Sequence, residues 1–442
     1  MNFRIIMNKY QCLIKKIFFI LFGTSGVLCF FSTSLAESMP VPPKTVTVLT
    51  RAGFDTKEAQ TLKESVISFN RIQHSYKVIM QHSNYRDYES LIHNAASTGS
   101  LPCLLEIDGP YVSSFAWLGY LQSLDKFISN ELRHDLLPSI LAQGTYDGHI
   151  YSLGQYDSGL GLWANRRYLN SANIRFPTTK KPWSLLEFEH AMDKLSTVKG
   201  VDYPLNLAVY AKGTQEFYTY AYSPILQGFG GDLIDRSDYH SASGVLDGAQ
   251  SVTAMQRFQS WFKKGWSRAV VNHNNDFEMG KTALSWTGHW KYQDYRHALG
   301  DDLILLPLPD FGHGIKTGMG SFSWGISSSC SAPEGAAKFL NYLMSAKEIT
   351  RATNNNGALP ARISVLKQSP IYGKQGSLRV YAQQLINGYG VPRPVTPGYS
   401  TITRAFSDAV YAIIAGADVQ TSLSIAATKI DKDIASNQGY PQ

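Results

Sequence analysis

Short apolar strands alternate with amphipathic helices along the chain. Valines alternate with threonines over residues 45–50, and this period of two predicts a half-buried strand. Apolar residues then recur at helical spacing over residues 59–69, and further strands are predicted over residues 76–81 and 101–107. This order of strand, helix and strand predicts an α/β architecture with parallel sheets.

The later part of the chain keeps this alternation but contains more helix. Strands are predicted over residues 303–306 and 322–327, and Asp147-Gly148 marks a hairpin turn. No internal repeat and no linker rich in proline and serine follows Lys44. We therefore expect lobes joined by strand-like crossings. Apolar stripes predict helices over residues 88–95, 185–195, 252–262, 336–343, 402–413 and 423–430.

Length and composition narrow the class of protein. The chain has 442 residues, which is too many for one core and enough for two lobes of about 150–200 residues each. Hydrophobic residues make up 44%, which excludes a disordered chain. The net charge of +7 falls to +3 without residues 1–36, which contain four bases and no acid. So weak and dispersed a charge argues against a nucleic-acid partner.

Residues 1–36 have the three parts of a secretory signal. Lys15 and Lys16 precede an apolar run, and Ser34-Leu35-Ala36 supplies small residues before cleavage at Glu37. The alternative is an uncleaved membrane anchor, but the apolar run is short and contains polar and glycine residues at 23–26. A lipid-modified Cys29 is a second alternative, disfavoured by the bulky leucine before it. We expect a cleaved signal and an exported protein.

Two cysteines remain after this segment is removed. Cys12 and Cys29 leave with it, whereas Cys103 and Cys330 stay in the mature chain. An oxidising compartment allows these two to pair, but sequence alone does not show that they meet. No cluster of cysteine and histidine has the spacing of a zinc site, so no metal and no other cofactor is expected.

Motifs of common enzymes are missing from the sequence. It contains no Gly-x-Ser-x-Gly elbow, no His-Glu-x-x-His pair and no phosphate-binding loop of the Gly-x-x-x-x-Gly-Lys-Ser/Thr type. Asp301-Asp302 reads as a solvated turn, because glycosidase carboxylates come from separate elements. The sequence therefore favours binding over catalysis.

Aromatic residues instead gather in loops beside small or polar neighbours. Trp286 and Trp290 lie four positions apart around Gly288, and Tyr156-Asp157 forms a second such segment. Aromatic planes cover the C–H faces of sugars, while carboxylate, guanidinium and amide groups bind the hydroxyls. The competing interpretation is that these tryptophans pack in the core. For Trp286 core packing and a sugar site are equally favoured, whereas for Trp290 the site is favoured because this residue follows a glycine turn.

The stretch from Phe277 to Trp290 is similar to an F-x-x-G-x-A-A and G-x-W pattern, and with it the chain resembles a known family. That family is the extracellular solute-binding proteins of sugar ABC importers, including those that bind maltose or trehalose. Each segment alone is weak, but five in the family's order behind a signal are specific. The other four are Leu306-Pro307-Leu308-Pro309, Trp324-Gly325-Ile326-Ser327, Glu334 to Leu340 and Asn356 to Arg362, and Arg393-Pro394 with Tyr399 matches the family's C-terminal pattern.

The resemblance implies the two-lobe fold of type II periplasmic binding proteins, an α/β fold with three crossings between the lobes. The first lobe would hold residues 37–153 with 306–355, and the second 160–301 with 358–442. The crossings would lie near residues 154–159, 302–305 and 355–357. Ligand would bind between the lobes, at the carboxyl ends of strands.

The resemblance also implies ligand-binding residues. Asp108 matches a carboxylate that binds sugar hydroxyls, Trp290 a stacking tryptophan, and Arg362 an arginine reaching hydroxyls from the third crossing. Weaker candidates are Trp286 and Tyr111. The remaining candidates are Tyr156 and Asp157 at the first crossing, and Gly320, Ser321 and Phe322 in a glycine–aromatic segment.

The function implied is capture without chemistry. A periplasmic monomer would close around a mono- or oligosaccharide, or a sugar alcohol, and deliver it to a membrane permease driven by an ATPase. One alternative is a secreted carbohydrate-active enzyme, for which Asp108 and Asp157 are the candidate carboxylates. Another keeps the fold but binds a polyamine, a metal or a polyol phosphate. The identity of the sugar stays open.

Overall fold

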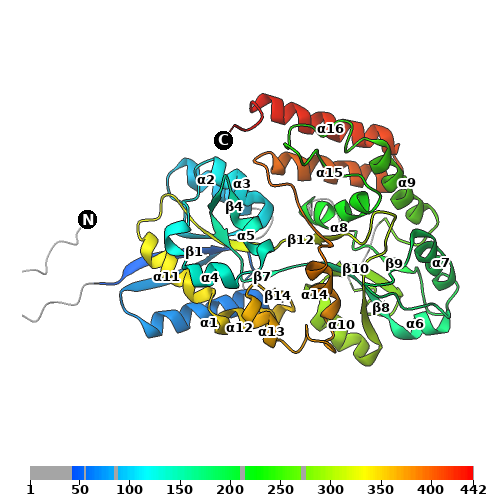
Figure 1. Ribbon diagram of the computed structural model, residues 1–442, viewed down its shortest axis with the longest axis horizontal. Coiled ribbons are helices and arrows are strands. Elements are labelled where there is room, and N and C mark those ends of the chain that lie inside the picture. Colours follow the sequence, from blue (N-terminus) through cyan, green and yellow to red (C-terminus); the bar gives the residue numbers. More distant parts are fainter. Residues whose placement is uncertain (1–41, 54–55, 84–87, 210–214, 270–274, 442) are drawn as a thin grey trace, which may run out of the picture. The chain divides into compact units, whose positions relative to one another are not determined.

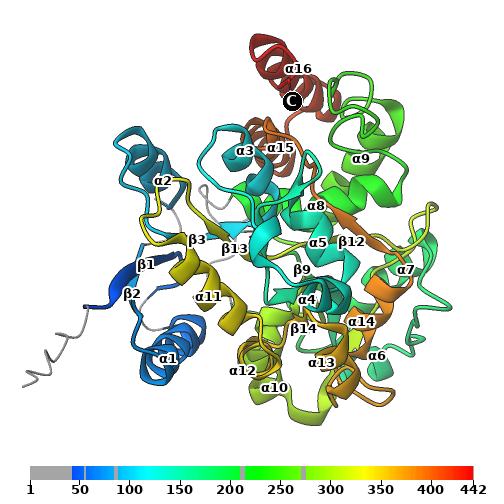
Figure 2. The same cartoon turned by 60° about the vertical axis from the view of Figure 1, so that its left-hand side comes forward.

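Alternate residues of β1 bury against opposite helices, and this places the first sheet between two layers (Figures 1 and 2). Val46 and Val48 pack with the apolar stripe of α1, whereas Leu49 packs with Ile92 of α2. The computed structural model describes residues 42–53, 56–83, 88–209, 215–269 and 275–441. The first sheet has the order β2-β1-β3-β13-β6, with bounds Tyr76–His82, Lys44–Thr50, Leu104–Asp108, Phe322–Ile326 and Ser152–Leu153.

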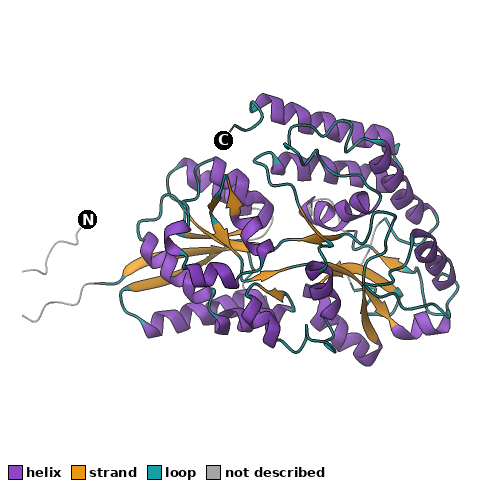
Figure 3. Ribbon diagram, viewed as in Figure 1, coloured by secondary structure: helices purple, strands orange, loops and turns teal. Residues whose placement is uncertain are grey.

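A second sheet of four strands lies further along the chain (Figure 3). Its central strand β8 is buried at all six positions and pairs antiparallel with both β11 and β10. In the first sheet, β13 likewise runs antiparallel to β3 and β6. The prediction of parallel sheets is therefore wrong, since both are mixed, and a buried apolar strand carries no mark of its direction. The order is β11-β8-β10-β9, with bounds Leu303–Leu306, Leu160–Asn165, Leu284–Gly288 and Leu205–Asn206.

Helices cover both sheets (Figure 3). Most residues of the predicted apolar stripes are buried, although Leu91 is exposed. Ser184 caps α7 through a reciprocal pair of bonds with Glu187, and Thr56 caps α1. Near the first sheet lie α1 (Lys57–Ile72), α2 (Tyr88–Ser97), α3 (Val112–Trp117), α4 (Asn130–Asp135), α5 (Pro138–Gly144), α11 (Pro333–Leu343), α12 (Ala346–Asn356) and α13 (Ile363–Gln368). Near the second lie α6 (Arg166–Ser171), α7 (Leu185–Leu195), α8 (Gln215–Gly228), α9 (Ala249–Lys263), α10 (Tyr292–Leu299), α14 (Arg379–Ile386), α15 (Tyr399–Ile414) and α16 (Val419–Ser436).

The chain passes between the two sheets at segments that differ in part from those expected. Residues 154–159, where the first crossing is expected, lie between β6 and β8. Residues 303–306 form β11 inside the second sheet, however, and Phe311 belongs to the same core. The passage back to the first sheet therefore lies nearer 316–321, and residues 306–315 do not pack with the first sheet. An apolar strand next to a crossing cannot be assigned to one sheet from its own sequence.

The third passage also lies later than expected. Ala361 and Val365 pack in the core beneath the first sheet, whereas Leu359 packs with Trp163 of β8, so residues 358–365 do not belong to the second sheet alone. Two short pairings lie beside these passages. One joins β7 (Tyr156–Asp157) to β14 (Leu359–Pro360), and the other joins β12 (Thr317–Met319) to β15 (Gly390–Pro392).

Two local predictions can be followed in the structure. The hairpin at residues 145–150 forms between β4 (Thr145–Tyr146) and β5 (His149–Ile150), with positive φ at Asp147 and Gly148. Cys103 and Cys330 form a disulfide that ties the entry of β3 to the loop after β13.

The expected signal at residues 1–36 lies outside the described residues. Within the part that the structure describes, no helix is both long enough and apolar enough to cross a membrane.

Candidate functional site

A cavity of about 650 Å³ lies between elements of the first and second sheets. Its size is typical of sites that enclose small molecules. From the first side it is lined by Arg51, Thr56, Lys57, Glu58, Asp108, Tyr156, Phe322, Asn355 and Asn356. From the second side and the connecting segments come Ser158, Glu216, Phe217, Tyr220, His289, Trp290, Gln293, Asp294, Gly320, Ser321 and Arg393.

Trp290 is the most exposed of the aromatic residues that line this cavity. It follows β10 in a short turn, is 37% exposed, and lies with its ring centroid 6.0 Å from that of Tyr220. A Cβ on Gly288 would meet the indole at 2.0 Å, so only glycine at that position lets the ring fold back onto the strand end. Gly288 thus allows the indole of Trp290 to form an aromatic surface at the end of β10.

The segment Gly320–Phe322 forms a second part of the wall, and its shape is fixed from behind. Gly320 has a φ of +107°, which favours glycine, and its backbone N–H donates to the Asp157 carboxylate at 3.1 Å. The Ser321 N–H donates to the Gln143 side-chain oxygen at 2.9 Å. Burial raises the pKa of Asp157, although hydrogen bonds to its carboxylate, including the one from Gly320, oppose the rise. Asp157 therefore positions the wall from beneath.

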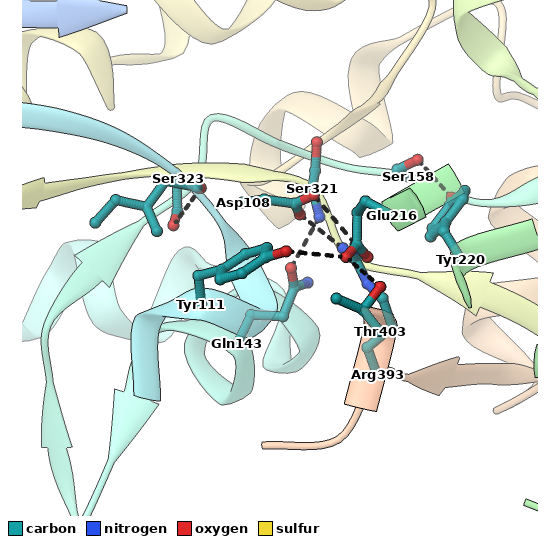
Figure 4. A network of polar contacts seen from close by, with 12 residues as sticks. Asp108, Tyr111, Gln143, Ser158, Glu216, Tyr220, Ser321, Ser323, Arg393 and Thr403 are labelled. Carbon is teal, nitrogen blue, oxygen red and sulfur yellow. Dashed lines mark hydrogen bonds and ion pairs between the residues drawn. The ribbon is translucent and has the colours of Figure 1, made fainter. Parts of the chain in front are cut away.

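An arginine joins the two sides of the cavity (Figure 4). Arg393 donates to both carboxylate oxygens of Asp108, at 2.8 and 3.1 Å, and its Nη1 also donates to Glu216. Asp108 ends β3 of the first sheet, whereas Glu216 lies at the start of α8, which packs on the second. Tyr399 donates to Glu216 at 2.5 Å and Thr403 at 3.0 Å. This network is almost entirely buried.

A second arginine organises the first side alone. Arg51 follows β1 and donates to Glu58 at 3.2 Å, while its backbone N–H donates to Glu106 at 3.2 Å. Its guanidinium carbon lies 3.1 Å from the ring centroid of Phe322. Burial raises the pKa of Glu106, which the nearby arginine opposes.

Charges on the cavity wall are largely compensated within the protein. The two arginines are each paired with carboxylates, and Asp294 lies 3.6 Å from Lys291. Burial lowers the pKa of His289 to about 4, so this ring is neutral near pH 7, with Nδ1 2.9 Å from the Asn356 carbonyl. A wall of this kind suits an uncharged, hydroxyl-rich ligand better than an ion.

Six of the residues predicted from sequence line the cavity together. They are Asp108, Tyr156, Trp290, Gly320, Ser321 and Phe322. Asp157 lies beneath the wall, as described above, and does not line it. Tyr111 lines a smaller hollow of about 130 Å³ that shares Asp108, Glu216 and Arg51 with the main cavity.

Two predicted residues lie away from the cavity lining. Trp286 is 1% exposed in the core of the second sheet, and its Nε1–H donates to the Ala221 carbonyl. Its position on β10 points it into the core, whereas Trp290 lies beyond the strand end. Arg362 donates to Asp135 at 2.6 Å and to the Met344 carbonyl, and both partners lie on first-sheet elements. The arginine thus fastens the start of α13 and does not reach the cavity.

Sequence reasoning overlooked several residues of the wall. Arg393 was noted only as part of a C-terminal pattern, and Arg51, Glu216 and Tyr220 were not singled out. The signal available for Arg393 was a cation before proline just after a strand. Nothing local marks Glu216, which becomes part of the site only because α8 packs beside α15.

The cavity wall shows no sign of a metal centre. Among the residues that the structure describes, no group of three or more histidines, cysteines or carboxylates could hold a metal ion.

Comparisons with curated proteins find distant relatives over much of the chain. An uncharacterized lipoprotein in the oleD 5' region of Streptomyces antibioticus is 21% identical over 326 residues, which cover 70% of this chain and 69% of that protein. The maltotriose-binding protein of Pyrococcus abyssi is 23% identical over 228 residues, covering 50% of this chain and 45% of that protein.

Solved structures share the fold. The GacH receptor of Streptomyces glaucescens, solved unliganded and with acarbose, superimposes with a TM-score of 0.72 at 21% identity, covering 90% of this chain and 98% of that one. The cyclic α-maltosyl-1,6-maltose binding protein of Arthrobacter globiformis gives 0.73 at 21% identity, covering 89% and 100%. The two-lobe binding-protein fold expected from the sequence is thereby confirmed.

A family profile extends this likeness to the sequence level. The profile of the bacterial extracellular solute-binding proteins matches residues 64–375, which is more than half of the chain. That stretch contains both sheets except the first strand, and most of the cavity wall. The chain therefore belongs to the family of bacterial extracellular solute-binding proteins, which are exported proteins that bind solutes.

Proposed function

We propose that this protein captures an uncharged sugar in the cavity and delivers it to the membrane permease of an ABC importer. The observation that carries the proposal is the combination of an exposed indole at Trp290 with a wall whose charges are largely paired within the protein. The sugar ligands named for the maltotriose-binding protein and the two solved structures support the same class.

The chemistry of the wall fits a ring of hydroxyls. Trp290, Phe217 and Phe322 supply apolar surface for the C–H faces of a pyranose. Around them, Ser321 and Asn355 offer neutral hydrogen-bonding groups, and the lone pairs of the paired carboxylates can each accept a further hydroxyl. A micromolar site needs about 8 kcal/mol, which a few such contacts can supply.

Capture would proceed by closure of the two sides around the ligand. The passages at residues 154–159, 316–321 and beyond 358 would act as hinges between lobes built on the two sheets. A ligand shifts this equilibrium only by binding the closed form more tightly than the open form. Contacts from both sides, such as Trp290 on one and Phe322 on the other, would provide that difference.

Catalysis is not part of this proposal, because neither candidate carboxylate suits it. Both oxygens of Asp108 accept hydrogen bonds from Arg393, and Asp157 is wholly buried beneath the wall. An acid–base pair needs carboxylates that reach the scissile bond. The sugar would thus leave unaltered.

Export would follow from the signal at residues 1–36, with the mature monomer in the periplasm and an ATPase driving the permease. This arrangement is what the family's role in import implies for a chain with a secretory leader. A Cys103–Cys330 disulfide fits an oxidising compartment of that kind.

A thermal-shift screen of neutral mono- and oligosaccharides and sugar alcohols tests the proposal. We expect at least one to raise the melting temperature and change tryptophan fluorescence, without turnover. Trp290→Ala should weaken that sugar at least tenfold, about 1.4 kcal/mol, whereas Leu186→Ala, also an exposed apolar side chain, should leave the affinity unchanged. A complete panel without any shift would reject the sugar assignment.

A further inference from the structure

Two carboxylates from opposite sides of the cavity converge on one nitrogen atom. Nη1 of Arg393 donates to Asp108 Oδ2 at 3.1 Å and to an oxygen of Glu216. Asp108 belongs to the end of β3 and Glu216 to the start of α8, and both line the cavity. A nitrogen with several N–H donors and a positive charge is what such a pair binds, whether it belongs to the protein or to a ligand.

Arg393 is held so firmly that it does not leave this position to a ligand. Its side chain is 4% exposed, and its guanidinium carbon lies 5.1 Å from the ring centroid of Tyr220. The neighbouring carboxylates raise its pKa above the ordinary value against the opposing effect of burial, so it stays charged. Displacing it would leave a buried cation without partners, which costs several kcal/mol.

The charge balance around Arg393 is one cation against two carboxylates. Further polar groups facing Glu216 are the hydroxyls of Tyr111, Tyr399 and Thr403, all of which can donate. Burial raises the pKa of Glu216 to about 7, with Arg393 opposing and Asp108 adding to the rise. Near neutral pH the cluster therefore carries at most a single net negative charge, and Arg393 is what keeps it from being an open anionic site.

We propose that Arg393 is a specificity-determining residue, which fills a built-in ammonium site and thereby restricts the cavity to uncharged sugars over amino sugars and other amines. The restriction to uncharged sugars rests on the proposed function, whereas the ammonium site does not. Without the guanidinium, Asp108 and Glu216 would accept hydrogen bonds from the primary ammonium group of a ligand at the place of Nη1.

The first test needs no sugar. Arg393→Ala vacates the nitrogen position, and millimolar methylammonium chloride should then raise the melting temperature of the variant by several degrees. The wild-type protein should not respond, and neither should the variant with tetramethylammonium chloride, which has no N–H donor. Arg296→Ala, the same change at an exposed ion pair, is the matched control. A variant that melts identically with and without methylammonium would overturn the proposal.

The second test uses sugars, and its measurement on Glu216→Gln keeps the proposal falsifiable if Arg393→Ala does not fold. Affinities of wild type and variants are compared for glucose, glucosamine and glucuronate, and for maltose as a larger neutral probe. Arg393→Ala should shift the glucosamine-to-glucose ratio at least tenfold toward the amine, and Glu216→Gln should shift the glucuronate-to-glucose ratio several-fold toward the acid. If a neutral sugar binds and neither ratio moves, the inference fails while the proposed function stands; if no neutral sugar binds wild type, the proposed function fails and the methylammonium result alone decides the inference.

Discussion

The two arginines of the cavity wall differ in what they connect. Arg51, Glu58, Glu106 and Phe322 all belong to elements around the first sheet, so their contacts form within one side. Arg393 connects Asp108 of the first sheet to Glu216 of α8 beside the second. Both clusters pair a cation with two carboxylates, yet only the second spans the cavity.

The two ion-pair clusters therefore have different structural roles. A cluster inside one side shapes that wall whether or not the two sides move, since all its members move together. A cluster that spans the cavity contributes its full pairing energy only while the sides keep this spacing. Burial makes the second cluster the more sensitive, because an uncompensated charge in a dry interior costs far more than one near water.

Arg393→Met should produce the largest loss of stability. The substitution keeps most of the side-chain volume but leaves Asp108 and Glu216 buried without their cation. We expect a loss of about 3–5 kcal/mol in the free energy of unfolding, measured by urea denaturation at pH 8. If the corresponding substitution at the other arginine, Arg51→Met, lowered the free energy of unfolding by the same amount, the two clusters would not differ in their contribution to stability.

Glu216→Gln should change the pH dependence of stability. The pKa of Glu216 in the folded protein, about 7, lies above its ordinary value, so the folded state holds this proton more tightly than the unfolded chain. Its contribution is therefore fully present below about pH 4.5 and is lost as the pH rises through 7, with a slope of up to about 1.4 kcal/mol per pH unit. The variant should lack this fall; an unchanged profile between pH 5 and 8 contradicts the expectation.

Arg51→Met should cost less, on the order of 1–2 kcal/mol. Glu58 is partly exposed and can be solvated, and Glu106 keeps a hydrogen bond of 2.6 Å from the Thr50 hydroxyl. The same urea titration at pH 8 gives the comparison with Arg393→Met. If Arg51→Met loses more free energy of unfolding than Arg393→Met, the cluster within one side contributes more to stability than the cluster that spans the cavity.

Trp117→Ala should have the smallest effect. This last residue of α3 donates from Nε1 to the Pro441 carbonyl at 3.0 Å and packs edge-on to Tyr440 beyond α16, so it too connects elements around the two sheets. Because the contact is partly exposed and involves one neutral hydrogen bond, we expect a loss of about 1 kcal/mol. Thermal melting against Trp117→Phe, which retains a ring, separates the hydrogen bond from the packing.

The sequence predicted most elements because the pattern of buried and exposed positions within a strand or helix depends on neighbouring residues. Threonine–valine alternation produced β1, the apolar stripes produced the long helices, and Asp147-Gly148 produced the hairpin. Aromatic residues beside glycine also located part of the cavity wall, with Trp290 and Phe322 on it. These features depend on neighbours a few residues away, which a single sequence displays.

Other features were decided only by the tertiary structure. Alternation cannot reveal the direction of β8 or the sheet that β11 joins, since it records which residues are buried and not which strand lies beside them. Trp286 and Trp290 look alike in sequence, yet one lies on the strand and the other past its end. Arg393 meets Asp108 across 285 positions and Glu216 across 177. Such pairings form because packing brings distant segments together, and no local pattern encodes a partner that far away.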